Sequence, residues 1–436
     1  MKNLIKDSPK AYISWALYDW ANSAFATTVM AGFFPVFFTE YLAKGARTAT
    51  TTFYLGLGNS IGSLVVAILA PILGAIADHG SYKKKFLIAF AFLGCLMTAN
   101  LSLVQAGQWQ LAILFYIVGS IGFSGANTFY DSLLPSVASE KKVDFISSLG
   151  FGIGYIGGGL LFAVNVLMFL KPELFNLTDG VAAIKASFII VGIWWFVFSI
   201  PLILFVKEEK LHKGVGVGKS IKVGLKEFKT TVKDLKHLPT LLTFLIAYWF
   251  YIDGVDTIVR MAVNFGTALG FSSSSLIVAL LLTQFVAFPS AILYSFFGKK
   301  VGIKKALLVA IVAYALIACL GAFMTKEFHF YLLACAIGLF QGGIQALSRS
   351  FYTRLIPANK HAEFFGFFNM LGKFAAILGP LLLGLVTLIT DNNRFGIISL
   401  VILFIIGGIL LAKVDLSNND KEIANFLAAK EKQLNK

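Results

Sequence analysis

Long apolar stretches recur along nearly the whole chain and constrain its fold more than any other feature. A helix needs about 20 mostly apolar residues to cross the hydrocarbon core of a bilayer. Twelve stretches meet that need: 11–41, 52–78, 85–106, 110–135, 143–170, 184–206, 239–266, 274–298, 304–325, 328–353, 361–390 and 394–413. Only 14% of the 436 residues are charged, about half the fraction of a typical soluble domain. We therefore expect an all-α integral membrane protein with twelve transmembrane helices.

The basic residues predict which side of the membrane each connection faces. An even number of spans puts both termini on one side, and 29 of the 37 Lys and Arg residues fall in the connections and tails of that side. The count places Arg349 and Arg354 in one of these connections. By the positive-inside rule both termini are then cytoplasmic. We therefore attribute the net charge of +15 to basic connections on the cytoplasmic side. Because nucleic-acid binding is not needed to explain this charge, we expect no nucleic-acid partner.

The longest hydrophilic stretch divides the chain into two six-helix bundles, 1–206 and 239–414, joined by a linker over 207–238 and followed by a tail over 415–436. In the linker, apolar residues recur at helical spacing between six lysines, at Ile221, Leu225, Phe228, Val232 and Leu235. This pattern predicts an amphipathic helix on the anionic cytoplasmic leaflet. The alternative is a solvated basic linker.

The two halves carry similar sequences in the same order. FYDSLLP (129–135) and FYTRLIP (351–357) lie 222 residues apart, and W-x-x-x-D occurs in spans one and seven (15–19 and 249–253). Six-span halves of like orientation indicate parallel repeats about an axis along the membrane normal, which places substrate near the midplane between them.

Two motifs resemble a known family. Gly74–Lys85, GAIADHGSYKKK, is similar to the major facilitator superfamily signature between spans two and three, although lysines replace its usual arginine. The opening SWALYDWANSAFATTV (14–29), with FFPVFF (33–38), resembles the unknown major facilitator group, which is similar to fungal autophagy-associated vacuolar amino-acid effluxers. The resemblance implies the major facilitator fold and a secondary transporter of amino-acid-like solutes.

The first of these motifs also has a physical interpretation of its own. Asp78 ends span two at the cytoplasmic surface, where helix N-termini and the following lysines can hold its charge. Such contacts would latch the halves in one access state; a plain interfacial charge cluster is the alternative. The predicted gating residues are Gly74, Asp78, Lys83, Lys84, Asp131 and Arg354.

Charges within the spans are costly and therefore mark candidate functional residues. Five stand out: Asp19, Asp253, Asp256, Arg260 and Lys373. The spacing of the three residues in span seven allows them to share one helical face. We predict that Asp253 or Asp256 carries a coupling proton and that Arg260 or Lys373 meets an anionic group of the substrate. Permanent salt bridges are the alternative, and Asp19, near its helix end, has a coupling, gating or structural role.

Polar and aromatic side chains around these charges are candidates for the substrate pocket. They are Tyr18, Asn22, Asn127, Tyr130, Asp131, Tyr155, Trp249, Gln284, Gln341, Gln345 and Asn369, of which Asp131 is also a gating candidate. Glycines in span five (150–159) and Gly379-Pro380 in span eleven predict packing seams and hinges. Three isolated cysteines, without metal-ligand spacing, indicate neither a disulfide framework nor a metal site.

The leading hypothesis is a proton-coupled secondary transporter, monomeric and multi-pass in the plasma membrane, for a small polar or zwitterionic solute. The chain carries no Walker sequence, HExxH motif or nucleophile elbow, so we expect neither an enzyme nor a cofactor. Two alternatives stay open: an exporter of amphipathic molecules such as drugs or lysolipids, and a transport-inactive facilitator that serves as a receptor or assembly platform.

Overall fold

The computed structural model describes residues 6–42, 48–208, 235–357, 360–390 and 392–434, with a few positions between 223 and 233. All regular structure in these residues is helical. Nine of the described helices are long and apolar enough to cross a membrane by length and composition. The all-α membrane fold is thus confirmed, while the count of twelve spans and the side of the termini stay predictions. The predicted linker helix falls largely outside the described residues.

The N-terminal half begins with α1 (Pro9–Ala24), which continues through π-helical turns (Phe25–Phe33 and Phe37–Leu42) on either side of α2 (Phe34–Val36). Its other helices follow in chain order: α3 (Thr48–Gly80), α4 (Lys83–Asn100), α5 (Trp109–Ser132), the short α6 (Leu134–Val137), α7 (Val143–Leu170) and α8 (Gly180–Phe205).

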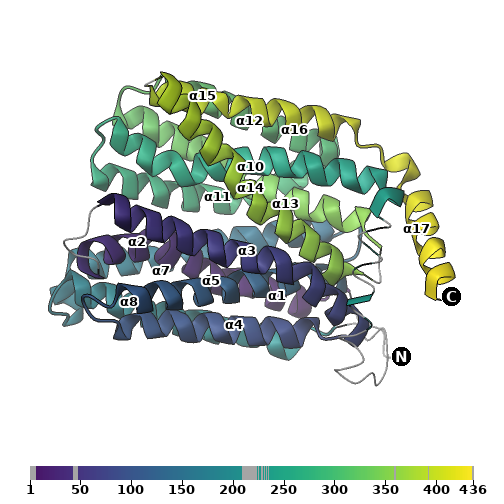
Figure 1. Cartoon of the computed structure of the whole chain (residues 1–436), viewed down its shortest axis with the longest axis horizontal. Helices are drawn as coiled ribbons and strands as arrows, with labels where there is room; N and C mark the ends of the chain where they lie inside the picture. Colours follow the sequence, from purple (N-terminus) through teal and green to yellow (C-terminus); the bar gives the residue numbers. More distant parts are fainter. Residues whose placement is uncertain are drawn as a thin grey trace.

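The C-terminal half has the same succession of long helices. They are α10 (Pro239–Ala268), α11 (Ser273–Val301), α12 (Ile303–Ala322), α13 (Glu327–Leu355), α14 (His361–Thr390), α15 (Asn393–Ser399) and α16 (Val401–Lys413). After them, α17 (Asn419–Leu434) projects from the end of the molecule at which both chain ends are marked (Figure 1).

Each half packs around an apolar core of its own, because helices that are apolar on most faces must bury one side against each other and leave the rest to lipid. One large buried cluster draws on residues 15–206 together with Ala362, and the other on residues 238–426. The two bundles lie side by side with their long helices running in the same general direction (Figure 1).

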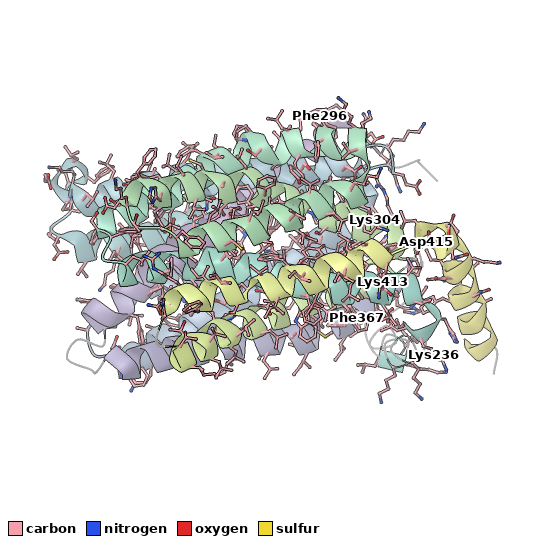
Figure 2. The ribbon with its side chains drawn as sticks, turned by 90° about the horizontal axis from the view of Figure 1, so that it is seen from above. Lys236, Phe296, Lys304, Phe367, Lys413 and Asp415 are labelled. Carbon is pink, nitrogen blue, oxygen red and sulfur yellow. The ribbon has the colours of Figure 1, made fainter. Side chains whose placement is uncertain are left out.

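A lysine at the start of the third long helix of each half caps the end of the sixth. The Lys84 ammonium on α4 donates to the Val206 carbonyl after α8, at 2.9 Å. The Lys304 ammonium on α12 donates to the carbonyls of Ala412 and Val414 at the end of α16, both at 2.7 Å. Unpaired carbonyls at a helix end favour a cation. Lys304, Lys413 and Lys236 all lie at the α17 end of the molecule (Figure 2).

The glycines of α7 form a packing seam, as predicted. A Cβ on Gly157 would lie 2.6 Å from the Trp20 ring, and one on Gly158 would lie 3.0 Å from the Ser23 carbonyl oxygen. Only residues without a side chain let α1 and α7 approach so closely. The seam fixes α1, and with it Asp19, against the rest of the N-terminal half.

Candidate functional site

A chamber lies between the two halves and holds charges of both signs. It encloses about 660 Å³ of empty space, part of it open to solvent. Its lining comes from both halves: Asp19, Asn127, Tyr130, Asp131, Phe151, Tyr248, Ile252, Asp256, Gln345, Arg349, Phe368, Asn369 and Gly372. Ligand sites of transporters with repeated halves lie in such a position.

The centre of the chamber wall is an arginine of α13 inserted into the N-terminal half. The Arg349 guanidinium donates to Asp131 Oδ1 on α5 at 2.9 Å and lies 3.7 Å from Asp19 Oδ2 on α1. It also donates to the Ser147 hydroxyl at 2.9 Å and to the Ser147 carbonyl at 2.8 Å, both on α7. Only 3% of the arginine side chain is exposed. A buried cation with this many acceptors ties the two halves together.

The sequence count was wrong about this residue. It placed Arg349 in a cytoplasmic connection, whereas the structure places it inside α13, well before the helix ends at Leu355. At the repeat offset of 222 residues, Arg349 corresponds to Asn127, which also lines the chamber. Two features of the sequence could have identified Arg349 as a residue of the chamber: this correspondence with Asn127, and its position within the predicted span 328–353.

Aromatic residues and an internal hydrogen bond hold Asp19 in place. The Tyr130 hydroxyl donates to Asp19 Oδ2 at 2.8 Å. The ring of Tyr130 stacks on Trp15 with centroids 4.3 Å apart, and Trp15 Nε1 donates to the Tyr130 carbonyl at 3.0 Å. Asp19 thus lies in the chamber wall rather than at a remote helix end.

Two further polar pairs bridge the halves beside the arginine. The Asn369 amide on α14 donates to Asp131 Oδ2 at 3.2 Å, so the C-terminal half contacts both oxygens of this carboxylate. The Tyr155 hydroxyl on α7 donates to Gln345 Oε1 on α13 at 2.6 Å. These contacts place Asp131 in the wall of the chamber, and the sequence had made it a candidate both for the pocket and for the gate.

The predicted latch residues meet where α3 ends and α14 begins. Asp78 accepts hydrogen bonds from the backbone amides of Ala362 at 3.1 Å and Glu363 at 2.8 Å, and Lys83 Nζ lies 2.8 Å from its Oδ1. A carboxylate is favoured at a helix N-terminus by the free amides and the helix dipole. A Cβ on Gly74 would lie 2.3 Å from the Ala362 carbonyl oxygen, so the close approach of α3 and α14 requires glycine there.

A second ion pair joins the halves at the same end. Arg354 Nη2 lies 2.7 Å from Asp144 Oδ2 at the start of α7. Nearby, Glu208 accepts from the amides of Lys83 at 2.9 Å and Lys84 at 3.2 Å, and so caps α4. Burial raises the pKa of Glu208 above its ordinary value, and the two amide hydrogen bonds oppose that rise. The molecule is closed at this end, which the lysine-rich connections predict to be cytoplasmic.

The three charged residues of α10 do not share one site. Asp253 is fully buried and turned toward α14, where both carboxylate oxygens accept from the Gly379 amide at 3.0 Å. Asp256 lines the chamber, and Arg260 Nη2, on a side chain 54% exposed, lies 3.9 Å from it. Asp256 and Arg260 therefore pair along the helix at the predicted spacing, whereas Asp253 contacts α14 and is not among the residues that line the chamber. The Lys373 side chain lies outside the described part of the chain.

The remaining predicted pocket residues are distributed over three places. Asn22 donates to Asn127 at 2.5 Å inside the N-terminal half, and Tyr18 is buried there. Trp249 packs against the core of the C-terminal half. Gln284 and Gln341 line a second, apolar cavity of about 810 Å³ within the C-terminal half, where Met261, Phe265 and Phe330 also lie. None of these residues is among those that line the chamber, except Asn127.

The sequence reasoning missed the aromatic part of the chamber. Phe151, Tyr248 and Phe368 line it beside Arg349, but a single aromatic residue in a membrane helix carries no signal that separates a binding role from packing. Among the described residues no group of three or more His, Cys, Asp or Glu side chains could hold a metal ion.

Known proteins resemble this chain over nearly its full length. YxiO of Bacillus subtilis, an uncharacterized MFS-type transporter, is 41% identical over 416 residues, which cover 94% of this chain and 96% of YxiO. Autophagy-related protein 22 of Eremothecium gossypii is 25% identical over 459 residues, covering 91% of this chain and 88% of the relative.

Solved structures share the fold at low sequence identity. The human organic anion transporter MFSD10 superposes with a TM-score of 0.69 at 12% identity, covering 93% of this chain and 100% of MFSD10. The proton:xylose symporter XylE superposes with a TM-score of 0.68 at 12% identity, covering 93% of this chain and 94% of XylE. These likenesses confirm the major facilitator fold.

The family follows from a direct match to its sequence model. The model described as vacuole effluxer Atg22 like matches residues 41–424, which include the Gly74–Lys85 motif and all of the C-terminal bundle. Together with the relatives that cover more than nine tenths of the chain, this match confirms the predicted resemblance to the family. The chain belongs to the Atg22-like family of major facilitator transporters.

Proposed function

We propose that the protein is a proton-coupled secondary transporter of a small zwitterionic, amino-acid-like solute, which it moves by alternating access of the two bundles. One observation carries this proposal: the chamber between the bundles contains a buried cation, Arg349, that is shared by two carboxylates of the opposite half. A zwitterion brings one charge of each sign and can exchange partners with such a set without leaving an uncompensated buried charge. The family match to vacuole effluxers supports the same class of activity.

The coupling proton is assigned to Asp19, with Asp256 as the second candidate. Both carboxylates line the chamber, whereas Asp253 lies apart from it against α14. Asp19 lies farther from the guanidinium than Asp131 does, at 3.7 Å against 2.9 Å, so its charge is compensated less directly. A carboxylate whose cationic partner moves away becomes easier to protonate. Separation of the halves at Arg349 therefore favours proton uptake by Asp19.

Opening at the predicted cytoplasmic end requires the latch to release. The contacts of Asp78 with the first turn of α14, and of Arg354 with Asp144, must break together with those of Arg349. Because all three join the same two bundles, a rigid rotation of one bundle against the other breaks them as a set. Substrate binding at Arg349, or protonation of Asp19, then biases the equilibrium between the state closed at this end and the state closed at the opposite end.

A second candidate substrate class is favoured by the apolar cavity of the C-terminal half. Its lining contains no charged side chain, and its about 810 Å³ could hold the tail of an amphipathic molecule. An exporter of amphipathic molecules would use both cavities. A transport-inactive receptor would bind a ligand in the chamber without moving it.

We place the transporter in the plasma membrane as a monomer, coupled to H⁺ and with its basic linker against the anionic leaflet. The bacterial relative YxiO supports this location, whereas the family model that matches the chain is named for the vacuole.

Ligand panels and flux measurements separate these possibilities. Thermal shift of the detergent-purified protein with amino acids, sugars, lysolipids and drugs identifies the class that stabilises it. Counterflow of a radiolabelled hit in proteoliposomes then tests for transport, with Arg349→Gln expected to abolish it and Arg260→Gln to retain it. Stabilisation by lysolipids alone would select the amphipathic exporter, and stabilisation without counterflow the inactive receptor.

A further inference from the structure

The guanidinium of Arg349 is enclosed by aromatic faces as well as by carboxylates. Its central carbon lies 4.2 Å from the ring centroid of Phe151, 4.9 Å from that of Trp15 and 5.5 Å from that of Tyr130. A cation within about 6 Å of an aromatic face is attracted by the ring quadrupole, most strongly where water is excluded. Three such faces and two carboxylates are more than a structural ion pair needs.

The three aromatic rings and the two carboxylates named for this enclosure all belong to the N-terminal half. Trp15 and Asp19 come from α1, Tyr130 and Asp131 from α5, and Phe151 from α7. Only the cation itself comes from the C-terminal half, on α13. The enclosure therefore remains behind as a unit when the bundles separate.

Contacts that do not involve Arg349 hold this enclosure in shape. Trp15 stacks on Tyr130 and donates to its carbonyl, and the Tyr130 hydroxyl fixes Asp19. A Cβ on Gly150 would lie 2.8 Å from the Tyr130 hydroxyl and 2.9 Å from both Trp15 and Asp19, so α7 closes the back of the site. A site built before its ligand arrives loses little free energy to ordering on binding.

We propose that these five residues form a binding site for an organic cation, a primary ammonium or guanidinium group, which Arg349 occupies while the cytoplasmic end is closed. When that end opens, the cationic group of the solute takes the place of the arginine, and Arg349 is freed to meet the solute's anionic group. The inference rests on the proposed function only in requiring that the two bundles separate at Arg349. It assigns the binding of the solute's cationic group to the N-terminal half, through Asp19 and Asp131.

The chemistry of the site selects an organic cation over a metal ion. Aromatic faces offer no lone pairs, whereas hard metal cations require about six or more oxygen ligands. A planar guanidinium or an alkylammonium matches both the flat faces and the carboxylates.

Removal of the internal cation tests the site directly. In purified Arg349→Ala protein, methylguanidinium should raise the melting temperature in a saturable manner, while its neutral isostere N-methylurea should not. Adding Asp131→Asn or Trp15→Leu should weaken methylguanidinium binding about tenfold, the equivalent of about 1.4 kcal/mol. Arg394→Ala, which removes an arginine that donates to the Ala322 carbonyl elsewhere in the C-terminal half, should show no such rescue.

A second variant covers the case in which Arg349→Ala does not fold. Asp78→Asn combined with Arg354→Gln weakens the closed end but retains Arg349, so it should bind methylguanidinium more tightly than the native protein does. Rescue by N-methylurea as well, or rescue independent of Asp131, would overturn the proposal, as would the absence of binding in both variants. Methylguanidinium binding without flux of any zwitterion would instead retain the site and refute the proposed transport.

Discussion

At the scale of single residues, the structure places the most consequential charge where two halves of the chain meet. Arg349 and Asp131 lie 218 positions apart in the sequence and 2.9 Å apart in space. Breaking a buried pair by removing one partner costs about 3–5 kcal/mol, because the other charge stays buried without compensation.

We predict that Asp131→Asn and Arg349→Gln each lower the melting temperature, and that the double variant is more stable than the sum of the two losses implies. Loss of the first charge leaves a buried partner, which the second substitution removes. A double-mutant cycle in one detergent measures this coupling. Strictly additive losses would show that the two side chains do not interact.

Asp253, a buried acid that does not line the chamber, has a different role in this account. Asp253 accepts from the Gly379 amide, and an asparagine retains an oxygen at that point. Asp253→Asn should therefore keep both folding and the response to a pH gradient, whereas Gly379→Ala should destabilise, since its Cβ would lie 2.0 Å from Thr257 Oγ1. Gly384→Ala is the matched control, because no atom lies within 4 Å of a Cβ there. Melting curves and flux assays check these expectations.

At the scale of helices, we propose that the contact between α3 and α14 acts as the gate at the predicted cytoplasmic end. Gly74→Leu has no room against Ala362, so we predict that it drives the two helices apart and shifts the population toward opening at this end. Spin labels at the exposed positions 142 and 300 report the distance between the halves. Gly384→Leu, on the open side of α14, should leave the distance distribution unchanged. An unchanged distribution in Gly74→Leu would contradict the gate.

The C-terminal helix is anchored on the same end. Phe426 on α17 is fully buried and packs against Phe364 of α14, with ring centroids 6.0 Å apart, and Glu422 accepts from the Thr240 amide at 3.0 Å. We predict that Phe426→Ala releases α17, at a cost of about 3–5 kcal/mol for a buried phenylalanine. Faster tryptic cleavage after Lys421 is the readout, and exposed Asn425→Ala is the control. Equal cleavage rates in both variants would contradict the docking.

At the scale of the whole molecule, apolar run length and family motifs were enough to predict the fold, because lipid imposes both helix length and internal hydrogen bonding. The latch could also be predicted, since Asp78 and its lysines are neighbours in the sequence. The chamber could not, because it is formed by side chains from helices that only packing brings together. Arg349 shows this most clearly, because the positive-inside rule counted it among the cytoplasmic basic residues, whereas the structure buries it between the two halves.

The most direct test of the central claim is uptake of a stabilising zwitterion into proteoliposomes with and without an imposed pH gradient, for the native protein and Asp19→Asn. The account predicts that the gradient drives native uptake, and that Asp19→Asn loses this response. The variant should retain exchange of labelled for unlabelled solute, with a lower affinity because Asp19 also belongs to the cation site. An unaltered response to the gradient in Asp19→Asn would contradict the assignment of the coupling proton to the chamber.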